Sequence, residues 1–380
     1  MRKMVNSLCA LFKIVYLCTT IANIIGTFQR NRHPVLMKVI EEGQRYNLIQ
    51  GDCLSVLRDV ESESINCIIT SPPYWGMRAY DNEDDEHEIG NEATFRQYVE
   101  KLTAVFREAR RVLTKDGSFW LNLGDRYVNK ELLGMPWRVA IALIDDGWIM
   151  RNDVIWHQLK GTQSCKDRLR DSYEHVFHFV KSRKYYYDAD SILIKPSRLP
   201  VVTENSTTSS TGVSGKKYRK QIRESKELTE QEKINAEKAL DEVLAEIKAG
   251  LVNDFRMTIR GEQRAWHSDN AKISGRAKEL VNRGYYVMKI HAKGHLPSDV
   301  WNIVTEDTWR TDSHSAVYPE ELLRIPILST CPEGGIVLDP FNGTGTTVSA
   351  ALKLGRKGVG IDLSPKYIKT SKERLIQVLL

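Results

Sequence analysis

The sequence is poor in closely spaced cysteines. Its six cysteines are scattered over 380 residues, and no two of them form a Cys-x-x-Cys pair. Structural zinc sites and disulfide-rich domains depend on such clusters. The spacing therefore argues against both classes of protein and favours a reducing compartment. We expect a cytoplasmic protein that binds no metal ion.

An uninterrupted apolar run long enough to span a membrane is also missing. Leu8–Phe28 is largely apolar, but Lys13 and Asn23 interrupt it, and no clear small-residue cleavage site follows. We interpret residues 1–40 as an N-terminal extension of unclear role, a packed amphipathic helix pair rather than a membrane anchor or a signal peptide. Met37 is a second candidate for the natural start, because a strand-like sequence follows it directly.

The third absence is that of a phosphate-binding loop. No Gly-Lys-Ser or Gly-Lys-Thr occurs, which excludes the common nucleoside-triphosphate site. What the chain does have is a basic balance, with a net charge of +6 and a pI near 8.8, which suits a polyanionic partner. With 41% hydrophobic residues, it is long enough for one large or two modest domains.

From Arg45 onward, short apolar strands alternate with amphipathic helices. Strands are predicted at 46–50, 65–69, 118–123, 154–157, 174–180, 336–339 and 358–362, and helices at 53–60, 95–113 and 136–146. This alternation predicts βαβ units, and hence an α/β fold with a mostly parallel sheet.

The stretch Thr70–Trp75 ends the second of these strands abruptly. Pro72 and Pro73 remove two backbone donors and fix φ, which makes the turn stiff. Ser71 adds a hydroxyl that can donate and accept, and Tyr74 adds a flat aromatic face. At the carboxyl end of a parallel strand, where α/β sheets bind ligands, this set suits a planar ring with an exocyclic amine. The alternative is a plain Pro-Pro turn that closes a core strand.

A second turn, rich in glycine, follows the strand Ile336–Asp339. Gly343 and Gly345 permit a sharp strand-to-helix turn and a close approach of the backbone to a ligand. A Gly-x-Gly alone could bind a dinucleotide or nothing, but the next strand ends at Asp362, where a ribose diol would lie. Asp52, at the end of the first strand, could accept a hydrogen bond from a ligand, cap the following helix, or do both.

Between these two motifs, the composition changes. A Ser/Thr/Gly-rich segment at 203–215 predicts a flexible loop, and Thr229 with Glu232 forms a capping box for a later helix. A basic cluster with an interleaved aromatic lies between them, formed by Lys216, Lys217, Arg219, Lys220 and Arg223. The stretch is either a solvated, charged helical insertion or a surface whose cations contact phosphates. Its position between two halves of an α/β domain favours the second interpretation.

Two motifs resemble those of one protein family. Thr-Ser-Pro-Pro-Tyr-Trp-Gly, with Ser-Pro-Pro-Tyr at 71–74, resembles the catalytic motif of DNA amino-methyltransferases, in the serine form of the branch that makes N4-methylcytosine. Asp-Pro-Phe-x-Gly-x-Gly-Thr-Thr from residue 339, with Gly-x-Asp ending at 362, resembles the S-adenosylmethionine motifs of the same family. The order, with the catalytic turn first and the cofactor strand last, is the permuted order of the family's beta group. The resemblance covers about residues 45–187 and 294–375.

Further segments resemble the family outside these motifs. They are Ile155–His157, Asp167–Arg168, Glu174–Phe177 and Lys181–Tyr187, and upstream of the cofactor strand Thr305, Asp312, His314, Pro319 and Glu320–Leu322, which resemble the helix that completes the cofactor pocket. One departure is Gln158–Gly161, which replaces an expected Lys-Pro-Asn-Pro run.

The resemblance implies a methyltransferase-type, Rossmann-like α/β fold with an inserted DNA target-recognition region. The implied division is an extension at 1–40, a catalytic half at 41–194, a recognition insert at 195–293 and a cofactor half at 294–380. The implied catalytic residues are Ser71, Pro72, Pro73 and Tyr74. The implied cofactor-binding residues are Asp52, Asp339, Phe341, Gly343, Gly345, Thr346 and Asp362. The implied DNA-binding residues are Lys216, Lys217, Arg219, Lys220 and Arg223.

The implied activity is transfer of a methyl group from S-adenosylmethionine to a base flipped out of duplex DNA, by direct displacement that depends on positioning. No cysteine stands in a Pro-Cys context, so methylation of cytosine carbon 5 has no candidate nucleophile. Adenine as the target, an RNA substrate and a catalytically silent DNA-binding module remain alternatives. A restriction endonuclease for the same site is a further expected partner, a membrane is not, and the expected location is the cytoplasm of a prokaryote.

Overall fold

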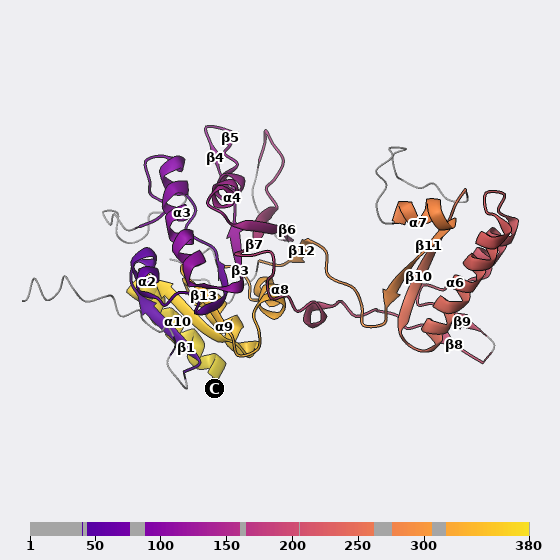
Figure 1. The fold of residues 1–380 in the computed structure, drawn as a ribbon. Helices are drawn as coiled ribbons and strands as arrows, with labels where there is room; N and C mark the ends of the chain where they lie inside the picture. The colour runs from indigo at the N-terminus through magenta and orange to yellow at the C-terminus, as the bar shows by residue number, and fades with distance from the viewer. Residues whose placement is uncertain are drawn as a thin grey trace, which may run out of the picture. The chain divides into compact units, whose positions relative to one another are not determined.

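The computed structural model describes residues 40, 44–76, 88–159, 165–204, 206–261, 276–305 and 317–379 (Figure 1). Within these ranges, no helix has the length and apolar character that crossing a membrane requires. The predicted N-terminal helix pair and the alternative start at Met37 lie outside the described residues, as do Lys160, Gly161, Asp312 and His314.

The chain folds into two compact units. Residues 1–187 and 300–380 form the first, and residues 188–299 form the second. The second unit extends beyond the predicted insert, residues 195–293, at both ends. The segments through which the chain enters and leaves it pair with each other, since Ile194 and His295 exchange backbone hydrogen bonds of 2.9 and 3.2 Å.

An eight-stranded sheet organises the first unit, in the order β1-β14-β13-β2-β3-β7-β6-β12. Strand β7 runs antiparallel to both neighbours, and every other neighbouring pair is parallel. The strands are β1 (Tyr46–Gln50), β2 (Ile65–Thr70), β3 (Leu113–Leu123), β6 (Ile149–Gln158), β7 (Tyr173–Val180), β12 (Val300–Ile303), β13 (Ile336–Asp339) and β14 (Lys357–Asp362), with a small separate pair β4 (Tyr127–Val128) and β5 (Glu131–Leu132). The predicted mostly parallel α/β sheet is confirmed.

The centre of the sheet joins segments that are far apart in the sequence. Strand β13 lies between β14 and β2, with Val337 opposite Cys67 and Leu338 opposite Ile68. The proline turn follows β2 and the glycine turn follows β13. Because these strands are parallel neighbours, both turns lie at the same edge of the sheet.

Helices pack against the sheet and form two large apolar cores and a third, smaller one (Figure 1). They are α2 (Cys53–Asp59), α3 (Phe95–Val112), α4 (Met135–Asp145), α8 (Glu321–Thr330), α9 (Thr346–Lys353) and α10 (Pro365–Leu379). Side chains alternate along a strand, so Ile68 and Phe119 pack with α2, α3 and α4, whereas Ile69 and Trp120 pack with α8. Burying each large apolar side chain contributes roughly 1.5–3 kcal/mol.

Local signals fix the ends of α3. Thr94 caps the helix by accepting from the backbone N of Gln97 (3.3 Å), and the Gln97 side chain accepts from the backbone N of Thr94 in return (3.1 Å). The helix ends at Val112, close to the predicted end. Strand β3 begins directly after it, earlier than predicted, because the chain stays extended through the turn-like Asp116-Gly117 pair.

The second unit has an apolar core of its own. Its elements are the 3-10 helix η1 (Asp190–Ile192), β8 (Val201–Val202), β9 (Thr207–Thr208), α5 (Lys216–Glu224), α6 (Glu230–Lys248), β10 (Val252–Ile259), α7 (Arg276–Arg283) and β11 (Tyr285–His291). The capping box predicted for α6 is confirmed, since Thr229 accepts from the backbone N of Glu232 (3.3 Å) and Glu232 accepts from that of Thr229 (2.8 Å). The apolar side of α6 packs on the antiparallel pair β10–β11.

Candidate active site

The proline turn is tied to the neighbouring strand that precedes the glycine turn. Strand β2 ends at Thr70, which is fully buried. Its hydroxyl donates to Oδ1 of Asp339, at the end of β13 (2.5 Å). This hydrogen bond fixes the starting points of the two turns relative to each other.

A polar network holds Tyr74. Its hydroxyl donates to Glu174 Oε2 (2.6 Å), and Ser71 Oγ donates to Tyr74 Oη (3.4 Å). Asn122 Nδ2 donates to Glu174 Oε2 (2.8 Å) and lies 3.1 Å from Tyr74 Oη and 3.3 Å from Ser71 Oγ. The second oxygen of Glu174 accepts from Gln158 Nε2 (2.9 Å). Side chains from β3, β6 and β7 thus fix two of the four predicted catalytic residues.

The environment of Tyr74 makes it a rigid plate rather than a base. Burial and the nearby Glu174 carboxylate raise the pKa of Tyr74 well above its usual value, so the phenol keeps its proton. Gly124 lies against the ring, because a Cβ at that position would be 2.8 Å from Tyr74 Cε2. Both the hydroxyl and part of the ring are therefore held in place.

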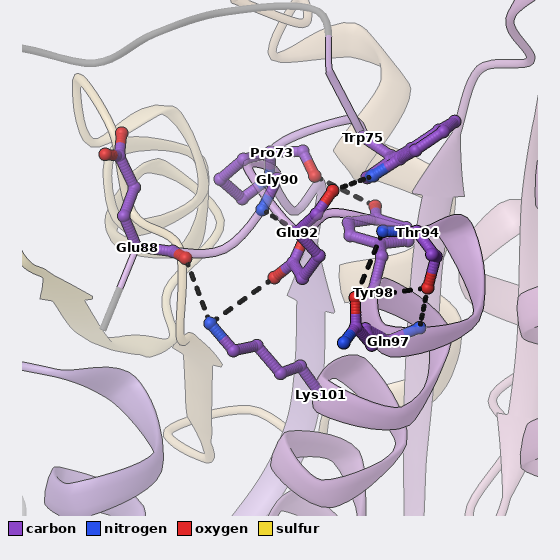
Figure 2. Close-up of polar contacts among 9 residues, drawn as sticks. All are labelled: Pro73, Trp75, Glu88, Gly90, Glu92, Thr94, Gln97, Tyr98 and Lys101. Carbon is purple, nitrogen blue, oxygen red and sulfur yellow. Dashed lines mark hydrogen bonds and ion pairs between the residues drawn. The ribbon is translucent and has the colours of Figure 1, made fainter. Parts of the chain in front are cut away.

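Figure 2 shows how the rest of the turn is braced. The carbonyl of Pro73 accepts from the Tyr98 hydroxyl (2.8 Å), and Trp75 Nε1 donates to the carbonyl of Glu92 (2.8 Å). The carbonyl of Pro72 accepts from no residue that the structure describes. Of the two proline carbonyls, that of Pro72 is the one left to accept from a ligand.

Asp339, predicted to bind the cofactor, is buried among protein donors. Oδ1 accepts from Thr70 and from the backbone N of Phe341 (3.0 Å). Oδ2 accepts from the hydroxyls of Tyr318 (3.0 Å) and Thr347 (2.6 Å). A carboxylate offers about four lone pairs, so these donors fill it. Burial raises the pKa of Asp339, and the hydrogen bonds oppose that shift. A contact between Asp339 and a cofactor stays a prediction.

Asp362, at the end of β14, has acceptor positions left. Oδ2 accepts from the backbone N of Gly343 (2.7 Å) and Oδ1 from that of Ser364 (2.9 Å), which leaves about half of its lone pairs. Burial raises the pKa of Asp362 to about 7. Gly343 (φ 50°) and Gly345 (φ 82°) adopt left-handed conformations, and a Cβ on Gly345 would lie 2.8 Å from Ser371 Oγ.

Asp52 lies at the same edge of the sheet. Strand β1 pairs with β14, with Gln50 opposite Asp362, and Asp52 follows β1 after one residue. Its side chain accepts from the backbone N of Ser55 (2.8 Å) and caps α2, which confirms the predicted cap. The same carboxylate as a ligand acceptor stays a prediction.

Three more residues belong to the glycine turn. Phe341 is half-buried and packs edge to face on Phe106, with ring centroids 6.4 Å apart. The buried hydroxyl of Thr346 accepts from Arg374 Nη1 (2.9 Å). The hydroxyl of Thr344 is also buried, yet it has no hydrogen-bond partner in the described part of the chain. An orphaned buried hydroxyl in a glycine turn fits a polar ligand that approaches the backbone.

Comparison with known proteins decides the family. The chain matches the profile of the family described as DNA methylase over residues 65–373. It is 31% identical over 389 residues to the Type II methyltransferase M.SfiI of Streptomyces fimbriatus, a match that covers 86% of this chain and 90% of that protein.

The chain belongs to the DNA methylase family. A second relative, the Type II methyltransferase M.Cfr9I of Citrobacter freundii, is 30% identical over 358 residues, covering 86% of this chain and 87% of that one. Among solved structures, the PvuII DNA methyltransferase (cytosine-N4-specific) superposes with a TM-score of 0.52 and 18% identity, covering 87% of this chain and 86% of that one. That likeness shows a shared methyltransferase fold.

In this DNA methylase, the predicted DNA-binding cluster lies on α5 of the second unit. Three of its five cations are paired with carboxylates: Arg219 with Asp241, Arg223 with Glu237 (2.7 Å) and Lys220 with Glu224 (4.0 Å). The other two, Lys216 and Lys217, are exposed and form no ion pair with any described residue. Binding of DNA by this cluster stays a prediction.

Sequence reasoning missed Asn122 and Glu174 as parts of the DNA methylase site. Asn122 stands inside the apolar run Phe119–Leu123 and is only 5% exposed. Glu174 is the second residue of a largely apolar strand, and only its likeness to the family pointed to it. A polar residue in a strand predicted to be buried was the available signal, because such a residue needs a hydrogen-bond partner.

Proposed function

We propose that this DNA methylase transfers a methyl group from S-adenosylmethionine to the exocyclic amine of cytosine in duplex DNA, forming N4-methylcytosine. The junction of the two turns carries the proposal. The Ser71–Tyr74 turn offers acceptors and a fixed aromatic plate, and the glycine turn offers a close backbone and the Asp362 carboxylate. The bond from Thr70 to Asp339 holds the two halves together.

The residues of the glycine turn fit S-adenosylmethionine. When bound, this cofactor supplies a sulfonium methyl group that a neutral amine can attack. Asp362 would accept from the ribose hydroxyls, because only two backbone donors use its four or so acceptor positions. The orphaned hydroxyl of Thr344 would gain a polar partner, and Phe341 would contribute an apolar wall.

The residues of the proline turn suit an exocyclic amine. The Ser71 hydroxyl and the Pro72 carbonyl would accept the two N–H groups, which directs the nitrogen lone pair away from them and toward the methyl group. Tyr74 would stack on the ring, with its plane fixed by Glu174 and Asn122. Since the phenol keeps its proton, the turn contributes positioning and electrostatics rather than a strong base. The serine form of the turn supports cytosine over adenine.

Duplex DNA as a substrate adds one requirement. An exocyclic amine inside the base stack cannot reach the site, so the target base must rotate out of the helix. The curated relatives are named Type II methyltransferases, which supports a restriction endonuclease of the same site specificity as a partner in a prokaryotic cytoplasm.

Labelled S-adenosylmethionine and unmethylated duplex DNA test the proposal, with digestion to nucleosides and mass spectrometry as the readout. We expect label in N4-methylcytosine. Label in N6-methyladenine would leave the site chemistry standing and show that Ser71 does not set the base. Label in RNA only, or in no nucleic acid, would contradict the proposed substrate.

A further inference from the structure

The face formed by α5 and α6 is poorly suited to carry DNA recognition alone. Helix α6 has six Asp or Glu residues against three lysines, and two of its carboxylates neutralise Arg219 and Arg223 of α5. A surface on which anions alternate with cations attracts a polyanion weakly. The second unit nevertheless holds 20 Lys and Arg residues against 16 Asp and Glu, so its excess positive charge must be presented elsewhere as well.

The antiparallel pair β10–β11 offers a second face. Phe255, Met257 and Ile259 of β10 belong to the core of the unit and face α5 and α6. Because side chains alternate along a strand, the residues between them point to the opposite face. That outer face is formed by Asp254, Arg256, Thr258, Tyr286, Met288 and Ile290, with Asp254 opposite Ile290, Arg256 opposite Met288 and Thr258 opposite Tyr286.

The exposed charge that the two strands present on this outer face is positive. Arg256 is exposed and forms no ion pair or hydrogen bond with any described residue. Asp254 is the one carboxylate of the two strands; it is 3% exposed, and both of its oxygens accept from the Thr211 hydroxyl (2.9 Å each). The other cation of these two strands, Lys289, lies on the inner face and forms an ion pair with Glu246 of α6 (2.7 Å). Among the residues that the structure describes, none therefore occupies the Arg256 guanidinium.

The shape and chemistry of the outer face match the major groove of DNA. The groove admits a two-stranded β-ribbon, and each base pair presents a distinct set of donors, acceptors and thymine methyl groups there. Arg256 can donate twice to guanine, the hydroxyls of Thr258 and Tyr286 can donate or accept, and Met288 can contact a thymine methyl group.

We propose that the outer face of β10–β11, centred on Arg256, reads base edges in the major groove and sets the sequence specificity of the enzyme. This inference rests on the proposed DNA methyltransferase function and names the surface that selects the site.

The test compares the DNA sites that the wild type and its variants methylate. Plasmid DNA is methylated by the wild type, Arg256→Ala, Arg256→Lys and the control Lys289→Ala, and methylated sites are mapped by single-molecule sequencing. Initial rates are then measured on duplexes with the wild-type site and with each single base-pair change. Arg256 is exposed and pairs with none of the described residues, so its replacement should leave the melting temperature unchanged.

For Arg256→Ala we expect a rate about 10- to 100-fold lower at the wild-type site and lost discrimination at one base pair, as for a bidentate contact to guanine. Arg256→Lys should also lose discrimination although it keeps the charge, because an ammonium lacks the two-pronged donor geometry. Lys289→Ala should keep the wild-type site and rate.

Three results would overturn the inference. If both Arg256 variants methylate the same sites at the same rates as the wild type, the outer face of β10–β11 does not read the DNA sequence. An equal loss on every duplex, with a weaker salt dependence, would make Arg256 a phosphate contact. Absence of DNA methylation by the wild type would reject the proposed function, and this inference with it, whereas the first two results leave that function intact.

Discussion

Two aspartates end neighbouring strands of one sheet, and their surroundings differ. Asp339 ends β13 and accepts from four protein donors, three hydroxyls and one backbone N–H. Asp362 ends β14 and accepts from two backbone N–H groups. Asp339 is buried and Asp362 half-buried, and only the second has lone pairs to offer a ligand. The number of protein donors around a carboxylate therefore separates a structural role from a binding role better than its place in a motif.

Glu174 extends the comparison to a third carboxylate. It accepts from Tyr74, Asn122 and Gln158, which leaves it little capacity for a ligand. Its donors include a residue of the catalytic turn. We therefore predict that Glu174 is a positioning residue, which acts on the reaction through the orientation of Tyr74.

The largest predicted effect is a loss of stability in the variant Asp339→Asn. This change removes an acceptor from at least two buried donors, and the free energy of unfolding should fall by about 2–4 kcal/mol. Urea unfolding followed by circular dichroism measures it. Asp362→Asn is the matched control and should lower the value by only about 1 kcal/mol, because it takes the acceptor from one half-buried backbone donor instead of at least two buried ones. Equal losses in the two variants would end the distinction between the aspartates.

For cofactor affinity, we expect the larger effect from Asp362→Asn and the smaller effect from Asp339→Asn. Asp362→Asn removes an acceptor for the ribose hydroxyls and should raise the Kd for S-adenosylmethionine about 10- to 100-fold, as for hydrogen bonds to a charged group. Isothermal titration calorimetry measures this value, and duplex DNA binding serves as the control that should not change. An unaltered Kd would refute the ribose assignment.

Glu174→Gln should separate turnover from binding. The amide keeps the size of the side chain but places an NH2 group among donors, so Tyr74 loses its fixed orientation. We expect kcat to fall about 10- to 30-fold, equivalent to one weakened hydrogen bond in the transition state, with an unchanged cofactor Kd. Gln158→Ala, which removes only the outer donor, should have a smaller effect. A cofactor Kd that rises in parallel with the loss of kcat would contradict a positioning role.

The smallest effect concerns pH. Burial raises the pKa of Asp362 to about 7, so the carboxylate proposed to accept from the ribose would be protonated below that pH. Cofactor affinity should weaken about tenfold between pH 8 and pH 6, and the Asp362→Asn variant should lack this dependence. For the ligand-free fold the sign is opposite: a raised pKa favours the folded state at low pH, and this contribution is lost as the pH rises from about 4 to 7.

The sequence predicted the α/β sheet and the positions of both turns, because hydrophobic period, proline and glycine act locally. It could not predict which distant residues form hydrogen bonds with one another. Thr70 and Asp339 are 269 positions apart, and Tyr74 and Glu174 are 100 apart. The same limit applies to α5, where a run of basic residues predicted a DNA surface. The carboxylates that neutralise Arg219 and Arg223 lie 22 and 14 positions farther along the chain, on the next helix.

The most direct test of the central comparison is a crystal structure of the protein with S-adenosylhomocysteine. The account predicts that the ribose hydroxyls donate to Asp362, while Asp339 keeps Thr70, Tyr318, Thr347 and the backbone of Phe341 as its donors. A ribose bound to Asp339, with Tyr318 or Thr347 displaced, would contradict it.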